Sequence, residues 1–315
     1  MYYKFFETTS EDNFDELRYL GANADLQSVK KENPNFNVYE HFLLHGKQES
    51  RKQLAVIPKN YLKNKFERFQ DILIMDGYKF ANRKNSFRII STENHLNLSD
   101  YHAESANGIP GYWFTELSQN PEGLYLDLGC GVRDIIFDNC LYIEVYPSIS
   151  ADIIMTPNRT LPIKDGTLDG VACLAVLEHV ENPFFVASEI KRVVKTGGKI
   201  FIDWPFLQPF HGFPSHYYNA TSLGLQKMFE DAFEIEQLKS YEEFQGASFT
   251  LNWVLNWFIE GIENDDIKNK LINMTVGELN ALKPGHEFYQ SCMNSMKIDT
   301  KRNLACGNTL IGRRR

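Results

Sequence analysis

Two glycines follow one apolar segment and an acidic residue ends the next in LYLDLGCGVRDIIFDNCLYIEVYP, residues 124–147. At the end of a strand, glycines let the backbone approach a ligand, because no Cβ stands in the way. A carboxylate at the end of the following strand can accept both hydroxyls of a ribose. The combination of Gly129 and Gly131 with Glu144 therefore predicts a nucleoside-cofactor site in an α/β fold.

Short apolar segments alternate with helical patterns from residue 123 onwards, which is typical of a mostly parallel sheet with right-handed crossovers. Pro183 suits the first turn of a helix that Gly197 and Gly198 end. We expect a Rossmann-like, seven-stranded, mostly parallel sheet with helices on both faces in residues 123–315. The expected strands are 124–128, 140–144, 151–155, 168–174, 199–204, 233–241 and 303–314, with a long helix over 248–262 before the last.

The first crossover is unusually short. Only 13 positions separate Gly131 from Glu144, since 144 − 131 = 13, whereas about 20 are usual after a nucleotide loop. We therefore expect a helix of one or two turns within residues 132–139.

Two segments precede the sheet. Residues 1–52 read as a small helical module, in which Phe14, Leu17 and Leu20 share one helical face. This module resembles one found beside glycan-related bacterial enzymes, and either a packing cap or a docking and homo-oligomerisation role fits it. Residues 53–122 read as a connector or lid, with a hairpin signal around Asp76 and Gly77.

Composition narrows the class of protein. The chain has 41 acidic and 33 basic residues, a net charge of −8, which argues against a nucleic-acid partner. No apolar run reaches the ~18 residues of a membrane span, and the first residues lack a signal-peptide pattern. Five cysteines without metal spacing predict reduced thiols, no metal site and a cytoplasmic location.

The glycine pattern excludes phosphate-bearing cofactors. A dinucleotide site needs G-x-G-x-x-G, but Asp134 occupies the last position, and no G-x-x-x-x-G-K-[ST] loop is present. A cofactor with a ribose and no phosphate fits better, and S-adenosylmethionine is the common one.

The segment from Leu124 to about Glu230 resembles class I S-adenosylmethionine-dependent methyltransferases. Its LDLGCG resembles their first motif, and LPIKDGTLDGVACLAVLEHVENP and EIKRVVKTGGKIFIDWP resemble their fourth- and fifth-strand regions. The later PFLQPFHGFPSHYYNATSLGLQKMF further resembles a methyltransferase-11-like branch found in bacterial polysaccharide gene clusters.

The resemblance implies roles for individual residues. Asp127 would meet the cofactor's ammonium group, and Glu144 would bind the ribose hydroxyls. Cys130 could be a nucleophile, although a small residue filling a tight turn is the simpler reading. Where many relatives place an adenine-binding Asp, this chain offers Thr156 or Asn158. The full set of cofactor-binding candidates is Asp127, Gly129, Cys130, Gly131, Glu144, Thr156, Ala175 and Val176.

Methyl transfer is an in-line displacement in which the enzyme mainly positions the acceptor, and a general base helps when the acceptor is a hydroxyl. Glu178, His179, His211 and His216 are candidates for that base, the histidines because their pKa lies near neutrality. His179 could instead orient the loop after the fourth strand. Aromatic residues around His211 and His216 could stack on sugar faces or belong to the core.

The function expected from these residues is methylation of an oxygen atom of a carbohydrate or other small acceptor. Methylation at nitrogen or carbon, for instance of a lipid precursor, is the alternative within the same fold. A non-catalytic module that keeps the cofactor fold and serves assembly is the alternative from another class.

Overall fold

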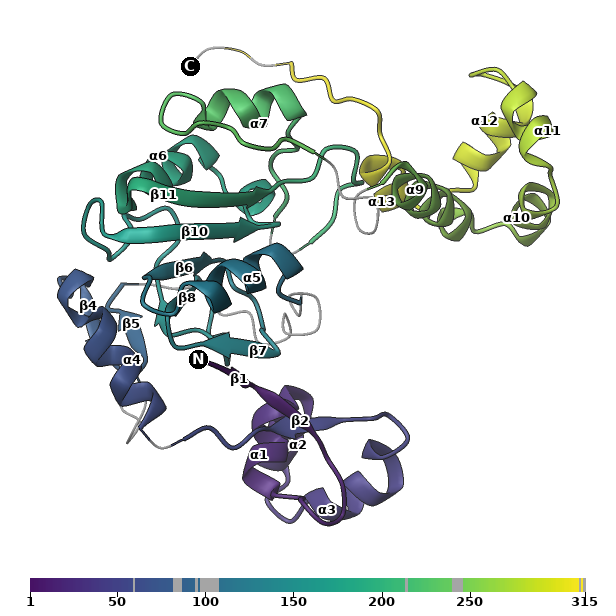
Figure 1. Ribbon diagram of the computed structural model, residues 1–315. Helices are drawn as coiled ribbons and strands as arrows, with labels where there is room; N and C mark the ends of the chain where they lie inside the picture. The colour runs from purple at the N-terminus through teal and green to yellow at the C-terminus, as the bar shows by residue number, and fades with distance from the viewer. Residues whose placement is uncertain are drawn as a thin grey trace. The chain divides into compact units, whose positions relative to one another are not determined.

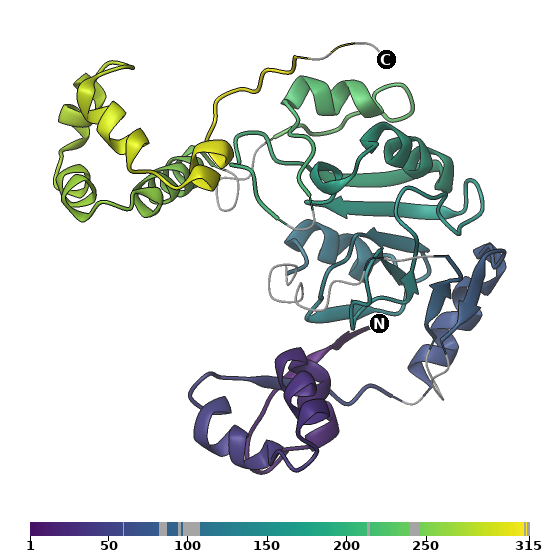
Figure 2. The ribbon, with the colours of Figure 1, turned by 180° about the vertical axis from the view of Figure 1, so that it is seen from behind.

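The computed structural model describes residues 1–58, 60–81, 87–93, 96, 108–212, 215–239, 246–311 and 313. The chain divides into two compact units, Met1–Trp204 and Pro205–Arg315. Figures 1 and 2 show both from opposite sides. The sheet and the glycine loop lie in the first unit.

A seven-stranded sheet forms the centre of the first unit, as predicted. Its strand order is β11-β10-β6-β8-β9-β5-β4, and every neighbouring pair is parallel except β5 with β4. Five strands coincide with those expected from the sequence. They are β6 (Tyr125–Leu128), β8 (Cys140–Glu144), β9 (Ile153–Ile154), β10 (Leu168–Leu174) and β11 (Val194–Asp203).

Helices α5 (Gly111–Gln119) and α6 (Pro183–Val193) lie on opposite faces of this sheet (Figures 1 and 2). Trp113 and Leu117 of α5 belong to one core cluster with Tyr125 and Tyr142 of the sheet. The buried side of α6 includes Ala187, Ile190 and Val193. Pro183 lies in the first turn of α6, as the sequence predicts, and Asn182 caps the helix. The helix ends at Val193, so the prediction that Gly197 and Gly198 end it was wrong; both glycines lie within β11, which pairs with β10.

The last two sheet strands come from a different part of the sequence than expected. They are β4 (Tyr78–Phe80) and β5 (Ile89–Ser91), whereas residues 233–239 and 304–311 form no strand. Residues 240, 241, 312 and 314, also assigned to those strands, lie outside the described residues. The two assignments were wrong because alternating apolar residues form a strand only where a neighbouring strand pairs with them.

The segment predicted as a connector or lid thus contributes to the sheet. It also carries α4 (Tyr61–Phe69), η2 (Gln70–Ile72) and α5, and Tyr61 belongs to the same core cluster as Tyr142. The hairpin is present, since β4 pairs antiparallel with β5. Its turn is not at Asp76 and Gly77, because both residues lie before β4. The carbonyl of Gly77 instead accepts a hydrogen bond from the Thr92 amide, just after β5.

The first crossover contains no helix. Residues 132–139 include the strand β7 (Ile135–Phe137), which pairs antiparallel with β1 (Tyr2–Lys4) in a separate ribbon. The short helix expected here was wrong because Ile-Ile-Phe favours extended structure and the start of the chain supplies a partner strand.

The rest of residues 1–52 is mainly helical. It contains β2 (Phe6–Thr8), α1 (Glu16–Ala22), α2 (Ala24–Glu32), α3 (Val38–His41) and the π-helical η1 (Phe42–Gly46), and β2 pairs with β3 (Lys52–Leu54). Tyr19, Leu26, Val38 and Phe42 form its core, with Phe14 and Leu20 packed against them. Leu17 does not share that face, because its side chain is 82% exposed.

A chain that starts at Gln53 should unfold at a lower temperature than the full chain, because it lacks β1. The loss removes three cross-strand pairs and the ring contacts of Tyr2 with Phe137 and Tyr3 with Tyr61, at 5.5 and 4.9 Å between centroids. We expect a shift of about 5–10 °C in Tm, which corresponds to ~2–4 °C per kcal/mol in a domain of this size.

The matched control removes the helices but keeps β1. Thr8 and Lys52 are paired across β2 and β3, so a short Gly-Ser linker can replace residues 10–50. This chain should keep a Tm near that of the full chain in a circular-dichroism melt. Equal loss of stability in both shortened chains would show that the helical module, and not β1, supports the sheet.

The second unit is helical. It contains α7 (Ser222–Phe229), α9 (Ala247–Gly261), α10 (Asp265–Ile272), α11 (Val276–Ala281), α12 (Glu287–Asn294) and α13 (Ile298–Asn303). The long helix predicted over 248–262 is therefore confirmed as α9. Ile262, Leu271, Phe288, Cys292 and Met296 form a small core. Among the described residues of the chain, none of the helices has the length and apolar character needed to cross a membrane.

Candidate cofactor site

The strand order reverses at β6. From β6 the chain continues to β8 and β9 on one side, and β10 and β11 lie on the other. In open parallel sheets, ligands bind at such a reversal, outside the carboxyl ends of the strands. The residues after β6, β8 and β10 therefore form the first place to look for a site.

The glycine loop after β6 is folded onto the end of β8. Gly129 and Gly131 have φ values of +70° and +58°, which disfavour residues with a Cβ. The amides of Gly129 and Cys130 both donate to the carbonyl of Ile143, at 2.9 and 3.1 Å. The Gly131 amide donates to Oε1 of Glu144 at 2.7 Å. The two glycines and the acidic residue singled out in the sequence thus meet in one structure.

Two hydroxyls hold the other side of this loop. Ser148 Oγ and Ser150 Oγ donate to the carbonyl of Gly131 at 2.5 and 2.9 Å. Both serines are buried and follow β8. They were not singled out in the sequence, because serines in a loop carry no signal until their partner is known.

Glu144 is a buried carboxylate, with 7% of its surface exposed. Its second oxygen accepts from the Val145 amide at 2.9 Å. Burial raises the pKa of Glu144 to about 7, although both backbone hydrogen bonds oppose the rise. Each carboxylate oxygen has capacity for one more hydrogen bond, so the arrangement is compatible with the predicted ribose contact.

Asp127 forms a buried ion pair with Arg133. The guanidinium donates through Nε to Oδ2 at 2.8 Å and through Nη2 to Oδ1 at 3.0 Å, and the residues are 1% and 2% exposed. Burial alone would lower the pKa of Arg133, but the neighbouring Asp127 carboxylate outweighs burial and raises this pKa. If Asp127 also contacts a cofactor ammonium group, as predicted, its carboxylate must bind that group and Arg133 at the same time. Arg133 was not predicted from the sequence. A single basic residue beside an apolar segment was the pattern that could have indicated a buried ion pair.

The end of β10 contacts the glycine loop. A Cβ added to Gly129 would lie 2.3 Å from Cγ2 of Val176, so the Val176 side chain packs against the Gly129 backbone. Ala175 has φ +52° without being a glycine, and its amide donates to the carbonyl of Asp203 at 3.0 Å. Ala175 and Val176, two of the predicted cofactor-binding candidates, therefore lie at the strand reversal.

Thr156 follows β9, where its Oγ1 lies 2.9 Å from Oγ of Ser91 on the neighbouring β5. Its predicted adenine contact stays a prediction. Cys130 is fully buried, and burial together with the charges of Glu144 and Asp127 raises the pKa of its thiol. A thiol held protonated and away from solvent is a poor nucleophile, which favours the turn-filling role.

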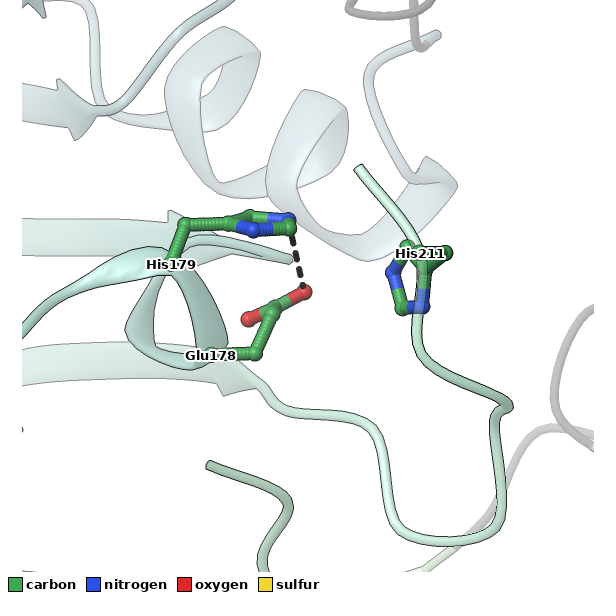
Figure 3. A group of neighbouring side chains, drawn as sticks. All are labelled: Glu178, His179 and His211. Atoms are coloured by element: carbon green, nitrogen blue, oxygen red, sulfur yellow. Dashed lines mark ion pairs between the residues drawn. The ribbon is translucent and has the colours of Figure 1, made fainter. Parts of the chain in front are cut away.

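Glu178 and His179 occupy the turn η3 (Leu177–His179) after β10. Figure 3 shows their side chains directed toward one another. His179 Nε2 lies 3.8 Å from Oε1 of Glu178. The Glu178 side chain has no exposed surface, and burial, with a smaller effect of Asp203, raises its pKa to about 8.

The two histidines of the second unit are bound within their own loop. His216 Nδ1 accepts from the His211 amide at 3.1 Å, and Nε2 lies 2.7 Å from Oδ1 of Asn219. The side-chain Nδ2 of Asn219 donates to the carbonyl of Gln208. The Oδ1 of Asn219 is therefore the acceptor toward His216, and His216 carries its proton on Nε2. His211 Nδ1 lies 2.8 Å from the carbonyl of Pro209, which places the lone pair on Nε2. The tautomer of His211 suits a base better than that of His216.

This fold and loop define an open α/β protein with a glycine loop at the strand reversal, where ligands bind in such sheets. The family model for a methyltransferase domain matches residues 143–202, which run from β8 to β11. The match confirms the resemblance of the chain to class I S-adenosylmethionine-dependent methyltransferases.

Individual relatives are distant. An uncharacterized protein of Methanocaldococcus jannaschii is 32% identical over a 92-residue alignment that covers 25% of this chain and 39% of that protein. The chain therefore spans only about two fifths of that relative.

Two solved structures were also matched. A chain from the complex between the Haloferax volcanii Trm112 methyltransferase activator and a methyltransferase is 15% identical, with a TM-score of 0.29, over 35% of this chain and 60% of that one. The Haemonchus contortus phosphoethanolamine N-methyltransferase 2, solved with phosphomonomethylethanolamine and S-adenosylhomocysteine, is 11% identical, with a TM-score of 0.33, over 92% and 72%. Scores of this size do not establish a common fold.

Proposed function

We propose that this chain transfers the methyl group of S-adenosylmethionine to an oxygen atom of a carbohydrate or other small acceptor. The observation that carries the proposal is the folding of the Gly129–Gly131 loop against Glu144 at the strand reversal. A loop with two left-handed glycines beside a buried carboxylate suits a ribose, and the chain has no phosphate loop.

Each residue near this loop has a role in the proposal. Glu144 accepts the ribose hydroxyls, and Val176 and Ala175 lie against the methionine moiety. Asp127, held by Arg133, faces the ammonium group. S-adenosylmethionine supplies an electrophilic methyl group when bound, so the remaining task of the chain is to orient the acceptor and take its proton. His179 and His211 are the proposed bases, with His216 positioning the loop.

A carbohydrate acceptor is favoured by exposed aromatic side chains on the loop that carries His211 and His216. These rings can stack on a sugar, and each is roughly half exposed in the described residues. They are Phe206, Phe210, Tyr217 and Tyr218, at 53%, 48%, 44% and 45%.

The cofactor is tested by calorimetry with S-adenosylhomocysteine, NAD and ATP. We expect binding of S-adenosylhomocysteine alone. Tight NAD binding without S-adenosylhomocysteine binding would refute the proposal. The acceptor is then sought by incubating the chain and S-adenosylmethionine with nucleotide sugars and glycans, with methylated products detected by mass spectrometry.

The affinity for S-adenosylhomocysteine should rise with pH. The folded pKa of Glu144, about 7, is above its ordinary value of 4.5, so the folded chain holds this proton more tightly than the unfolded chain. The stability that the proton contributes is complete below pH 4.5 and is lost as pH rises through about 7. The ionised form can accept both ribose hydroxyls, so affinity should increase about tenfold from pH 6 to pH 8.

The control for this pH dependence is Glu144→Gln, which cannot ionise. Its affinity should be roughly ten- to a hundredfold lower at pH 8, because contacts to a charged group contribute ~1.5–3 kcal/mol. Its pH profile should be flat. A wild-type profile that is equally flat would remove Glu144 ionisation from cofactor binding.

A further inference from the structure

Glu178 is the most unusual polar residue of the first unit. Its side chain is completely buried, yet among the described residues neither carboxylate oxygen has a hydrogen-bond partner beyond the backbone of Glu178 itself. A buried carboxyl group without a partner is costly, so native proteins pair such groups, keep them protonated or bind them to metals.

The neighbouring histidine supplies the second feature. Nε2 of His179 lies 3.8 Å from Oε1 of Glu178, and their side chains are directed toward one another in Figure 3. This separation is too long for a hydrogen bond. Two atoms that each lie about 2.0–2.2 Å from one ion can be up to ~4.2 Å apart. Glu178 and His179 can therefore bind the same ion.

We propose that Glu178 and His179 bind a divalent metal ion at the carboxyl end of β10. Carboxylate oxygen suits Mg²⁺ and Mn²⁺, and imidazole suits Zn²⁺ and other transition metals. A mixed pair favours Mn²⁺ or Zn²⁺. The proposal differs from the expectation, drawn from cysteine spacing, that the chain has no metal site.

The location gives the ion a role that rests on the proposed function. Glu178 follows Val176 by two residues, and Val176 contacts the loop proposed to hold the cofactor. Two protein ligands leave positions for water or for oxygen atoms of the acceptor, as in sites where Mg²⁺ is held by few carboxylates. The ion would bind an acceptor that carries neighbouring oxygens, such as a sugar, beside the transferable methyl group.

The test uses the full chain, treated with EDTA and dialysed, and Mn²⁺ as the probe. Titration followed by the electron paramagnetic resonance of free Mn²⁺ should show one tight site for each chain. Glu178→Gln and His179→Gln should each weaken this site at least about tenfold. The matched control is Glu122→Gln, which makes the same change at a side chain that is 92% exposed and should leave the titration unchanged. Competition with Zn²⁺ and Mg²⁺ then ranks the metals.

Folding is checked by thermal melts without metal. Glu178→Gln removes a buried carboxylate without a hydrogen-bond partner, so its Tm should equal or exceed that of the wild type, and added Mn²⁺ should raise Tm only in the wild type and the control. Absence of a Mn²⁺ site, or an unchanged site in Glu178→Gln, would overturn the proposal. Calorimetry with S-adenosylhomocysteine on the same samples separates the two ideas. If the chain binds S-adenosylhomocysteine but has no Mn²⁺ site, only the metal proposal is refuted. If it has the Mn²⁺ site but does not bind S-adenosylhomocysteine, the cofactor assignment is refuted.

Discussion

Gly129→Ala is expected to reduce the affinity for S-adenosylhomocysteine at least about a hundredfold and to destabilise the fold by ~2–4 kcal/mol. The new Cβ would lie 2.3 Å from Cγ2 of Val176, a distance that forces the Val176 side chain or the loop to move. The φ value of +70° adds the cost of a left-handed conformation. Denaturant unfolding and calorimetry measure the two effects.

Gly166→Ala is the matched control for this substitution. Gly166 has a similar φ of +59°, but a Cβ there meets no atom within 4 Å, so only the backbone cost of ~1–2 kcal/mol remains. The double variant Gly129→Ala with Val176→Ala should recover part of the lost stability, because it removes the contacting methyl groups. Wild-type affinity in Gly129→Ala would show that the loop does not hold the cofactor.

Arg133→Met is expected to destabilise the chain by about 3–5 kcal/mol, because it leaves the Asp127 carboxylate buried without its partner. Chemical denaturation at neutral pH measures the loss. The exposed pair of Arg159 and Glu93, with Nη2 to Oε2 at 2.8 Å and side chains 62% and 54% exposed, provides the comparison. Arg159→Met should cost less than about 1 kcal/mol.

A second variant separates the ion pair from the packing of Arg133. Combining Arg133→Met with Asp127→Asn removes the buried charge, so the double variant should be more stable than Arg133→Met alone. If the double variant is instead less stable by the full sum of the single losses, the two residues act independently and the buried pair does not hold the loop.

Most of the central sheet could be predicted from the sequence. Strands β6, β8, β10 and β11 are short apolar segments with clear ends, and a strand buried on both faces is recognised by such a segment. The position of the glycine loop was also predictable, because few residues other than glycine adopt its φ values. The hydrogen bond between Gly131 and Glu144 follows from the order of these elements, since neighbouring parallel strands end at the same edge.

The remaining strands were not predictable in this way. The segments around residues 233–241 and 303–314 alternate as convincingly as β4 and β5, and alternation does not say which segment finds a partner. The strand β7 replaces a crossover helix only because β1, more than a hundred residues earlier, pairs with it. Such pairings depend on contacts between distant parts of the chain, which local propensity does not encode.

The same distinction applies to the site. The sequence by itself determined the residue types at the strand ends: the glycines, Glu144, and the carboxylate and histidine after β10. Only the tertiary structure decided what surrounds them. It placed Arg133 on Asp127 and both Ser148 and Ser150 on the Gly131 carbonyl. In the described part of the chain it brought no donor from another residue to the Glu178 carboxylate. Burial and partners set the charge state and ligand preference of a side chain, and both arise only when distant segments pack together.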